Sequence, residues 1–423
     1  MYRELSQELF DFIGGSPSCF HVIGNVEAEL RGAGFEKLSQ AQEWELVQGG
    51  KYYITCNQST IIAWELPENE YKGFHIVASH SDFPTFKVKA NPEIKFEKLY
   101  TSLSVEKYGG PLMAPWFDRP LSIAGRVVTE ENGEIISKNV DFGKDCVSIV
   151  NLAIHMNREA NNGMSYKVSK DMVPIWAGAK NDVTFMDELA KVAGVNVEDI
   201  LDMDLYLYNR MEGKIWGAND EFISSTKLDD LQCAFTSMKA FMNVTGQDYV
   251  KVLAVFDNEE VGSSTRQGGK SNLLESVLKR IAENQGRTEE GYNIDLANSF
   301  LLSADNAHAV HPNYAEKADK TNHPYPNGGV VIKYTASQQY TTDARSGAYV
   351  KSMCKKAEVP YQVYFNHSDV VGGSTLGNLA ILQVPIMAAD VGAAQLAMHS
   401  PYETGGVEDT YNLMKLFEEF YKR

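Results

Sequence analysis

The stretch VLAVFDNEE, residues 252–260, decides how the fold of this chain is interpreted. Five apolar residues predict a buried strand, and Asp257, Asn258, Glu259 and Glu260 follow at its carboxyl end. In open α/β sheets, ligands bind beyond the carboxyl ends of the strands. Two adjacent glutamates at such a place are costly unless something binds them, because an unpaired buried carboxylate loses its hydration. A divalent metal would compensate one glutamate, and catalysis could use the other.

Further side chains that bind metals or protons lie beside other predicted elements. They are His80 and Asp82 after residues 74–78, Asp305 after residues 300–304, His399 beyond residues 384–388, and Asp229 before an apolar helical segment. Imidazole and carboxylate ligands suit zinc, and also manganese or cobalt. Two metal ions need a bridging carboxylate, and a free carboxylate beside them serves as general base. Asp82 is placed to hold the second ring nitrogen of His80 and so to orient it.

Each of these residues also has a purely structural interpretation. The Glu259-Glu260 pair is typical of a solvated helix start, Asp229 of a helix N-cap, and Asp305 of an Asx turn. His399 alone could be a hydrogen-bonded loop histidine. The joint occurrence of all of them at strand ends is much harder to explain by capping. We therefore interpret the set as a metal centre.

The order of predicted elements indicates an α/β fold. Short apolar runs at residues 74–78, 205–208, 252–256, 300–304 and 384–388 alternate with helical stretches at 230–243, 272–284 and 345–356. This alternation predicts a mixed, mostly parallel central sheet with helices on both faces, and residues 406–422 predict a closing helix. Residues 90–202 are richer in alternating strands, with helices predicted at 150–158 and 184–192. We expect a discontinuous domain, 1–89 and 203–423, divided by an inserted strand-rich domain, 90–202.

Composition excludes several classes of partner. The chain has 423 residues and a net charge of −17, which disfavours nucleic acid and anionic membranes. Its apolar runs fall short of the roughly 18 residues of a membrane span, and the charged N-terminal segment is typical of an amphipathic helix rather than a signal peptide. Five widely spaced cysteines without a CxxC motif predict reduced thiols and a cytoplasmic location.

Longer motifs give the chain a family resemblance. ASHSDFP at 78–84, WFDRPLSIAGRVV at 116–128, KLDDLQCAF at 227–235, DNEEVGS at 257–263, SADNAHAVHPNY at 303–314, GGVVIK at 328–333 and QLAMHS at 395–400 occur in order along nearly the whole chain. Together they resemble the aspartyl aminopeptidases, metallopeptidases with two metal ions and a phosphorylase/hydrolase-like core. One departure is Asp230, where that family often has asparagine.

The resemblance implies a role for each site residue. It implies that His80, Asp229 and Asp305 hold one ion and that Asp229, Glu260 and His399 hold the other, with zinc preferred over manganese or cobalt. Glu259 becomes the general base, and Asp82 supports His80. Lys333, Tyr340 and Met398 become substrate-binding residues, with Lys333 meeting an acidic first residue of the peptide. From the sequence alone, Lys333 is a solvated or snorkelling lysine at the end of a strand.

The resemblance also implies an assembly. Family members form tetrahedral dodecamers built from dimers, and their inserted domain makes the dimer contact. His155 aligns with a histidine that reaches the neighbour's active site, whereas the sequence alone predicts a buried helix histidine. The expected function is hydrolysis of N-terminal residues, preferably Asp or Glu, from peptides. The alternatives are a neutral, leucine-like preference, a carboxypeptidase-type or amidohydrolase relative, and a non-catalytic assembly scaffold.

Overall fold

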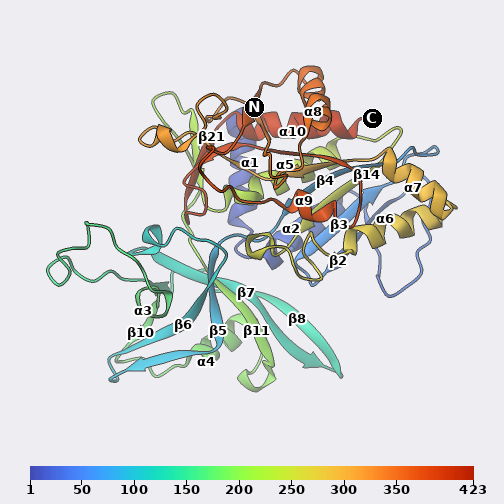
Figure 1. The fold of residues 1–423 in the computed structure, drawn as a ribbon. Coiled ribbons are helices and arrows are strands. Elements are labelled where there is room, and N and C mark those ends of the chain that lie inside the picture. The colour runs from blue at the N-terminus through green and yellow to red at the C-terminus, as the bar shows by residue number, and fades with distance from the viewer.

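The computed structural model describes residues 1–423 and has a nine-stranded central sheet (Figure 1). In spatial order its strands are β1 (Glu36–Lys37), β2 (Lys51–Cys56), β3 (Thr60–Glu65), β14 (Val250–Phe256), β4 (Phe74–His80), β15 (Phe300–Ala304), β19 (Met387–Gly392), β17 (Val330–Lys333) and β18 (Tyr361–Tyr364). The four central strands, β14, β4, β15 and β19, are parallel, while β3 and β17 run antiparallel to their inner neighbours. The mixed, mostly parallel sheet confirms the predicted fold class.

Helices cover both faces of this sheet. One face carries α1 (Tyr2–Gly14), α2 (Cys19–Gly32), α5 (Leu228–Asn243), α8 (Ala344–Lys356) and α10 (Asp409–Tyr421), and the other carries α6 (Leu273–Asn284), α7 (Glu289–Ala297) and α9 (Leu376–Ala380). Strand β14 shows why both faces are apolar. Leu253 and Val255 pack into the first core, and Val252, Ala254 and Phe256 pack into the second.

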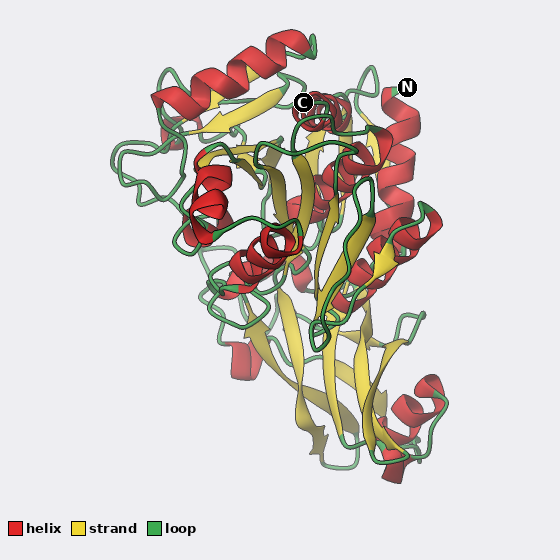
Figure 2. Ribbon diagram, turned by 90° about the vertical axis from the view of Figure 1, so that its right-hand side faces the viewer, coloured by secondary structure: helices red, strands yellow, loops and turns green.

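A second sheet of seven strands forms the lower lobe of the molecule (Figures 1 and 2). Its order is β11 (Asp202–Tyr208), β5 (Thr85–Phe96), β6 (Tyr100–Tyr108), β10 (Ile175–Gly178), β9 (Val147–Ser148), β7 (Pro120–Glu131) and β8 (Glu134–Asp141). Strand β11 also pairs with β7, which closes the sheet into a barrel around its own apolar core. Two helices, α3 (Val168–Asp171) and α4 (Phe185–Ala193), belong to this lobe. The division of the chain at residues 90–202 stays a prediction.

A third, small sheet lies beyond the carboxyl ends of the central strands. It contains β12 (Lys214–Trp216), β13 (Phe222–Ser225), β21 (Glu403–Gly406), β20 (Ala394–Leu396) and β16 (Ala307–His308). Strand β16 follows β15, and β20 follows β19, so the small sheet holds the segments that leave the central sheet. It thereby fixes the loop that carries His399 close to the ends of β4 and β14.

Three local predictions were wrong. Residues 205–208 belong to the second sheet rather than the central one, because Leu205 and Leu207 pack into the barrel core. Residues 150–158 form turns rather than a helix. Leu152 and Ile154 there are exposed, and a helix without a packed face has little to stabilise it. His155, in the same segment, is exposed rather than buried in a helix.

Two further features of the structure concern its cysteines and its helices. All five cysteines are unpaired thiols. None of the helices has the length and apolar character needed to cross a bilayer.

Candidate metal centre

The predicted metal ligands come from five places in the chain that converge at one end of the central sheet. His80 is the last residue of β4, and Asp305 directly follows β15. Glu259 and Glu260 form a short 3-10 turn after β14, entered through Asn258 in the left-handed conformation (φ 63°), which asparagine tolerates. This turn directs both glutamate side chains back toward His80.

One group of potential ligands surrounds His80. The ligand atoms of His80, Asp229, Asp230 and Asp305 all lie within 4.8 Å of one another, and all four residues are buried. His80 Nε2 lies 3.5 Å from Asp229 Oδ1 and 4.0 Å from Asp230 Oδ2. Asp230 is an addition to the predicted set, since its carboxylate also accepts the backbone N–H of His80 at 3.2 Å.

A second group surrounds His399. Its Nε2 lies 3.5 Å from Asp229 Oδ2 and 3.4 Å from Glu260 Oε2. Asp229, Glu260 and His399 together satisfy the same 4.8 Å criterion. The two oxygens of Asp229 thus face different imidazoles, Oδ1 toward His80 and Oδ2 toward His399. This is the arrangement that a carboxylate bridging two ions would have. Glu259 joins His80 and Glu260 in a third group within the same limit.

Asp82 supports the site in a way that the sequence did not indicate. Its carboxylate accepts the backbone N–H groups of Glu259 at 3.1 Å and Glu260 at 3.2 Å, and the hydroxyl of Tyr108 at 2.6 Å. The Nδ1 of His80 lies 3.4 Å from Asp82 Oδ1 and 3.0 Å from its backbone oxygen. One carboxylate therefore ties His80 to the turn that carries both glutamates.

Glu403 plays a matching part on the other side, and sequence reasoning missed it. It is buried, and it accepts the backbone N–H of Asp229 at 3.0 Å and that of His399 at 2.7 Å. The imidazole of His399 is in turn oriented by the carbonyl of Gly110, 3.1 Å from Nδ1. The available signal was a carboxylate four residues after His399, in a stretch with no predicted element.

The donor set fits a divalent cation. Burial raises the pKa of Glu260 and Asp230 well above the usual range and that of Glu259 to about 8. Burial opposes a charge on His80, but the carboxylates of Asp230 and Asp229 outweigh it and raise its pKa. Three buried carboxylate oxygens, Asp229 Oδ1, Asp230 Oδ1 and Glu260 Oε1, accept no hydrogen bond. Unpartnered buried acceptors are rare, and a bound cation would satisfy all three.

The structure also places the predicted substrate residues. Lys333, only 2% exposed, has its Nζ 3.6 Å from Asp305 Oδ1, donates to the carbonyl of Asn306 at 3.2 Å, and lies 5.3 Å from the centre of the Tyr340 ring. It is therefore neither solvated nor snorkelling. Met398 is half-buried in the loop beside His399. His155 lies in the exposed segment of the second lobe, outside both ligand groups.

Comparisons with known proteins give an independent indication of the family. The family profile described as "Aminopeptidase I zinc metalloprotease (M18)" matches residues 12–421. The chain is similar to the "Probable M18 family aminopeptidase 2" of Clostridium novyi (strain NT), with 42% identity over 427 residues that cover 99% of this chain and 98% of that protein.

Two solved structures from yeast are similar over the whole chain. The crystal structure of yeast aminopeptidase 1 (Ape1) superposes with a TM-score of 0.87 at 29% identity, covering 100% of this chain and 97% of that one. The structure of the S. cerevisiae mApe1 dodecamer gives a TM-score of 0.87 at 29% identity, covering 99% and 97%.

Proposed function

This chain belongs to the M18 family of zinc metalloaminopeptidases, and on that premise we propose that it is a two-metal exopeptidase that prefers acidic N-terminal residues. Metal-dependent cleavage of N-terminal residues follows from membership of the family. The single observation that carries the two-metal proposal is Asp229, whose two oxygens face the imidazoles of His80 and His399.

In this proposal the chain's residues divide into two ligand sets. His80, Asp229 and Asp305 would hold one ion, and Asp229, Glu260 and His399 the other. When bound, the ions, zinc by preference with manganese or cobalt as alternatives, would acidify a water and polarise the scissile carbonyl. Asp230 adds a carboxylate beside His80, and Asp82 and Glu403 hold the backbone of the ligand-bearing segments.

Glu259 is the proposed general base. Its carboxylate lies within the 4.8 Å limit of His80 and Glu260 and belongs to neither of the two ligand sets, and burial raises its pKa to about 8. Cations bound beside it would lower this pKa, so Glu259 could take a proton from the attacking water and give it to the leaving amine near neutral pH. Glu259→Gln should keep its metal content and lose most of its turnover. Near-normal turnover in a metal-loaded variant would reject this role.

Lys333 is the proposed determinant of acidic preference, with Tyr340 and Met398 completing the pocket. A local cation is needed because the net charge of −17 repels acidic substrates at long range. A charge-assisted contact contributes about 1.5–3 kcal/mol, roughly 10- to 150-fold in rate. Lys333→Met should therefore reduce cleavage of Asp- and Glu-initiated peptides more than cleavage of Leu-initiated ones. Equal losses would count against the assignment.

One observation favours the alternative of a neutral preference. The Nζ of Lys333 already lies near Asp305 Oδ1 and donates to the carbonyl of Asn306, so part of its charge is engaged inside the chain. A panel of aminoacyl substrates on the zinc-loaded enzyme separates the two preferences. Faster cleavage of the leucyl than of the aspartyl substrate would establish the alternative.

We further propose a cytoplasmic homo-oligomer, a tetrahedral dodecamer built from dimers, in which His155 enters a neighbour's site. Its support is the exposed apolar segment around His155, with Leu152 at 56% and Met156 at 74% exposure, together with the dodecameric state of the similar yeast protein. Sedimentation measures the assembly. Mixing and reassembling the inactive variants His155→Phe and Glu259→Gln should restore part of the activity, because some sites then combine two intact residues. Absence of any recovery in a mixed assembly would contradict action across subunits.

A further inference from the structure

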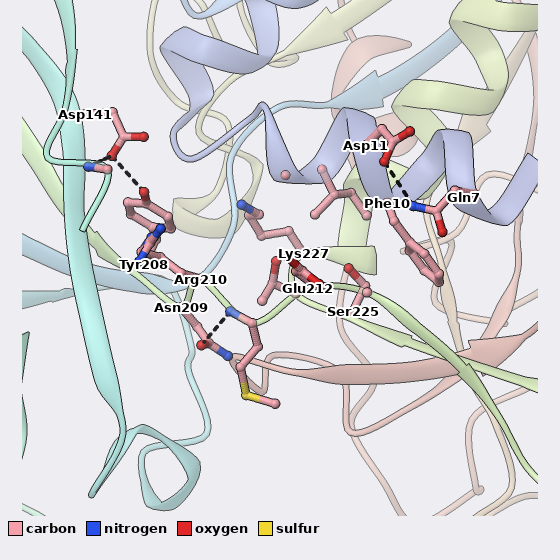
Figure 3. Close-up of a pocket in the computed structure, with 16 residues that line it drawn as sticks. Gln7, Phe10, Asp11, Asp141, Tyr208, Asn209, Arg210, Glu212, Ser225 and Lys227 are labelled. Atoms are coloured by element: carbon pink, nitrogen blue, oxygen red, sulfur yellow. Dashed lines mark hydrogen bonds between the residues drawn. The ribbon is translucent and has the colours of Figure 1, made fainter. Parts of the chain in front are cut away.

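A cavity of about 660 Å³ lies between α1, the end of β11 and the start of α5 (Figure 3). Its lining includes Phe10 and Asp11 of α1, Tyr208 and Arg210 at and after the end of β11, and Lys227 at the start of α5. It is separate from the two ligand groups of the metal centre, although Lys227 precedes Asp229 by only two residues. Cavities of this size between packed units of a protein commonly bind small molecules.

Lys227 is the unusual group in this cavity. It is 8% exposed and holds a left-handed backbone conformation (φ 56°) just before α5. Its ammonium donates one hydrogen bond, to the carbonyl of Ser16 at 3.0 Å, and lies 5.3 Å and 5.6 Å from the rings of Phe83 and Tyr208. No carboxylate oxygen comes within the 4.0 Å of an ion pair. An ammonium has three donors and is costly to bury unpaired.

The other buried lysines show what is missing. The chain buries three lysines, and the other two each have a carboxylate partner. Lys251 lies 2.9 Å from Glu65, and Lys333 lies 3.6 Å from Asp305. Lys227 alone has no such partner, and it is also the one that lines a large cavity.

Three carboxylates line the cavity, those of Asp11, Asp141 and Glu212, and none has an oxygen within 4.0 Å of the Lys227 ammonium. Asp141 accepts the hydroxyl of Tyr208 at 2.7 Å and the backbone N–H of Gly143 at 2.9 Å. Asp11 accepts from Gln7 at 3.0 Å, and Arg210 pairs with Asp145 at 3.0 Å. Asp141 attracts the Lys227 ammonium without contacting it, so a direct ion pair would have to come from an anion outside the chain.

We propose that this cavity binds a small carboxylate, which forms the missing ion pair with Lys227. A simple organic acid and a free amino acid, the class of product that an aminopeptidase releases, share this chemistry. Binding would fix the start of α5, from which Asp229 projects, so the ligand changes turnover without competing with the peptide. The binding site itself does not depend on the proposed substrate preference.

The test is calorimetric titration of the metal-loaded enzyme with its metal centre already saturated by an amino acid hydroxamate, which prevents carboxylates from binding there. Acetate, aspartate and inorganic phosphate are titrated separately. We expect saturable binding of a carboxylate, weakened at least tenfold by Lys227→Met and unchanged by Lys239→Met, a half-buried lysine paired with Glu8. Tighter binding of aspartate than acetate identifies an amino acid, and equal binding identifies carboxylates in general.

Several results would overturn the proposal. The first is the absence of saturable carboxylate binding, which would also follow if a neighbouring copy of the chain closed the cavity. The second is phosphate binding as tight as acetate binding, and the third is unchanged carboxylate binding in Lys227→Met. A second variant covers the case in which Lys227→Met fails to fold. A Cβ added at Gly14, which also lines the cavity, meets no atom within 4 Å, so Gly14→Trp can fill the space and leave Lys227 intact. It should weaken carboxylate binding at least tenfold, and unaltered affinity in a folded variant would again reject the site.

Discussion

Replacing Asp82 by asparagine should lower activity, because Asp82 holds the backbone of the turn that carries Glu259 and Glu260. The carboxylate uses Oδ1 for the N–H of Glu259 and Oδ2 for the N–H of Glu260 and the hydroxyl of Tyr108. An asparagine has one acceptor oxygen, so in either orientation its NH₂ group faces one of the two backbone N–H groups. Loss of a hydrogen bond to a charged group costs about 1.5–3 kcal/mol, equivalent to roughly 10- to 150-fold.

The assay is kcat/KM on an aspartyl and a leucyl substrate with metal content measured on the same samples. Asp82→Asn should lose about 10- to 150-fold on both substrates, because the loss displaces the proposed base and a proposed ligand rather than the proposed substrate pocket. Tyr108→Phe is the matched control, since it removes the hydroxyl that donates to the same carboxylate and accepts from the Asn258 amide, and it leaves both backbone N–H groups paired. The reasoning fails if metal-loaded Asp82→Asn stays within threefold of the wild type, or if Tyr108→Phe loses as much.

Three further predictions concern metal binding and stability. Glu403→Gln should bind zinc roughly tenfold or more weakly in competition with a chelator, because glutamine cannot accept both the N–H of Asp229 and that of His399; unchanged affinity would contradict this. Removal of metal with EDTA should abolish activity and lower the melting temperature, since buried carboxylates are left unpaired, and zinc should restore both; an active apoprotein would exclude the proposed chemistry. His75, buried between Tyr249 and Phe420, has its pKa lowered to about 3 by burial, so the unfolded chain binds the extra proton first and stability falls as pH drops below the ordinary value of 6.5. Between pH 7 and 5 this effect should lower the free energy of unfolding of the wild type by about 2 kcal/mol. In urea unfolding over the same pH range, the stability of His75→Gln should fall by that much less than the stability of the wild type, and parallel pH profiles of the two proteins would refute the assignment.

The central sheet was predictable where the apolar runs were short and bounded. Residues 252–256 and 300–304 match β14 and β15 to within two residues, and the helix predicted at 272–284 matches α6. The β2–β3 hairpin was not anticipated. Residues 205–208 were assigned to the wrong sheet because a strand does not reveal its partner. The burial of Leu205 and Leu207 in the barrel core places this strand in the second sheet.

The residues that could bind metal were predictable from the sequence, and the residues that hold them in place were less so. His80, Asp229 and Glu260 are residue types that bind metals at predicted strand or helix ends, and the structure brings them together. Glu403 is the first residue of β21, and its role consists of accepting two backbone N–H groups, which no sequence pattern encodes. For the same reason, the burial of Lys333 against Asp305 could not be predicted from a strand end alone.

The most direct test of the account is a crystal structure of the zinc-loaded protein with anomalous data at the zinc edge. The account predicts two zinc peaks per chain, both bonded to Asp229, one also bonded to His80 and Asp305 and the other to Glu260 and His399. A single peak, or two peaks with Asp229 bonded to only one of them, would contradict it.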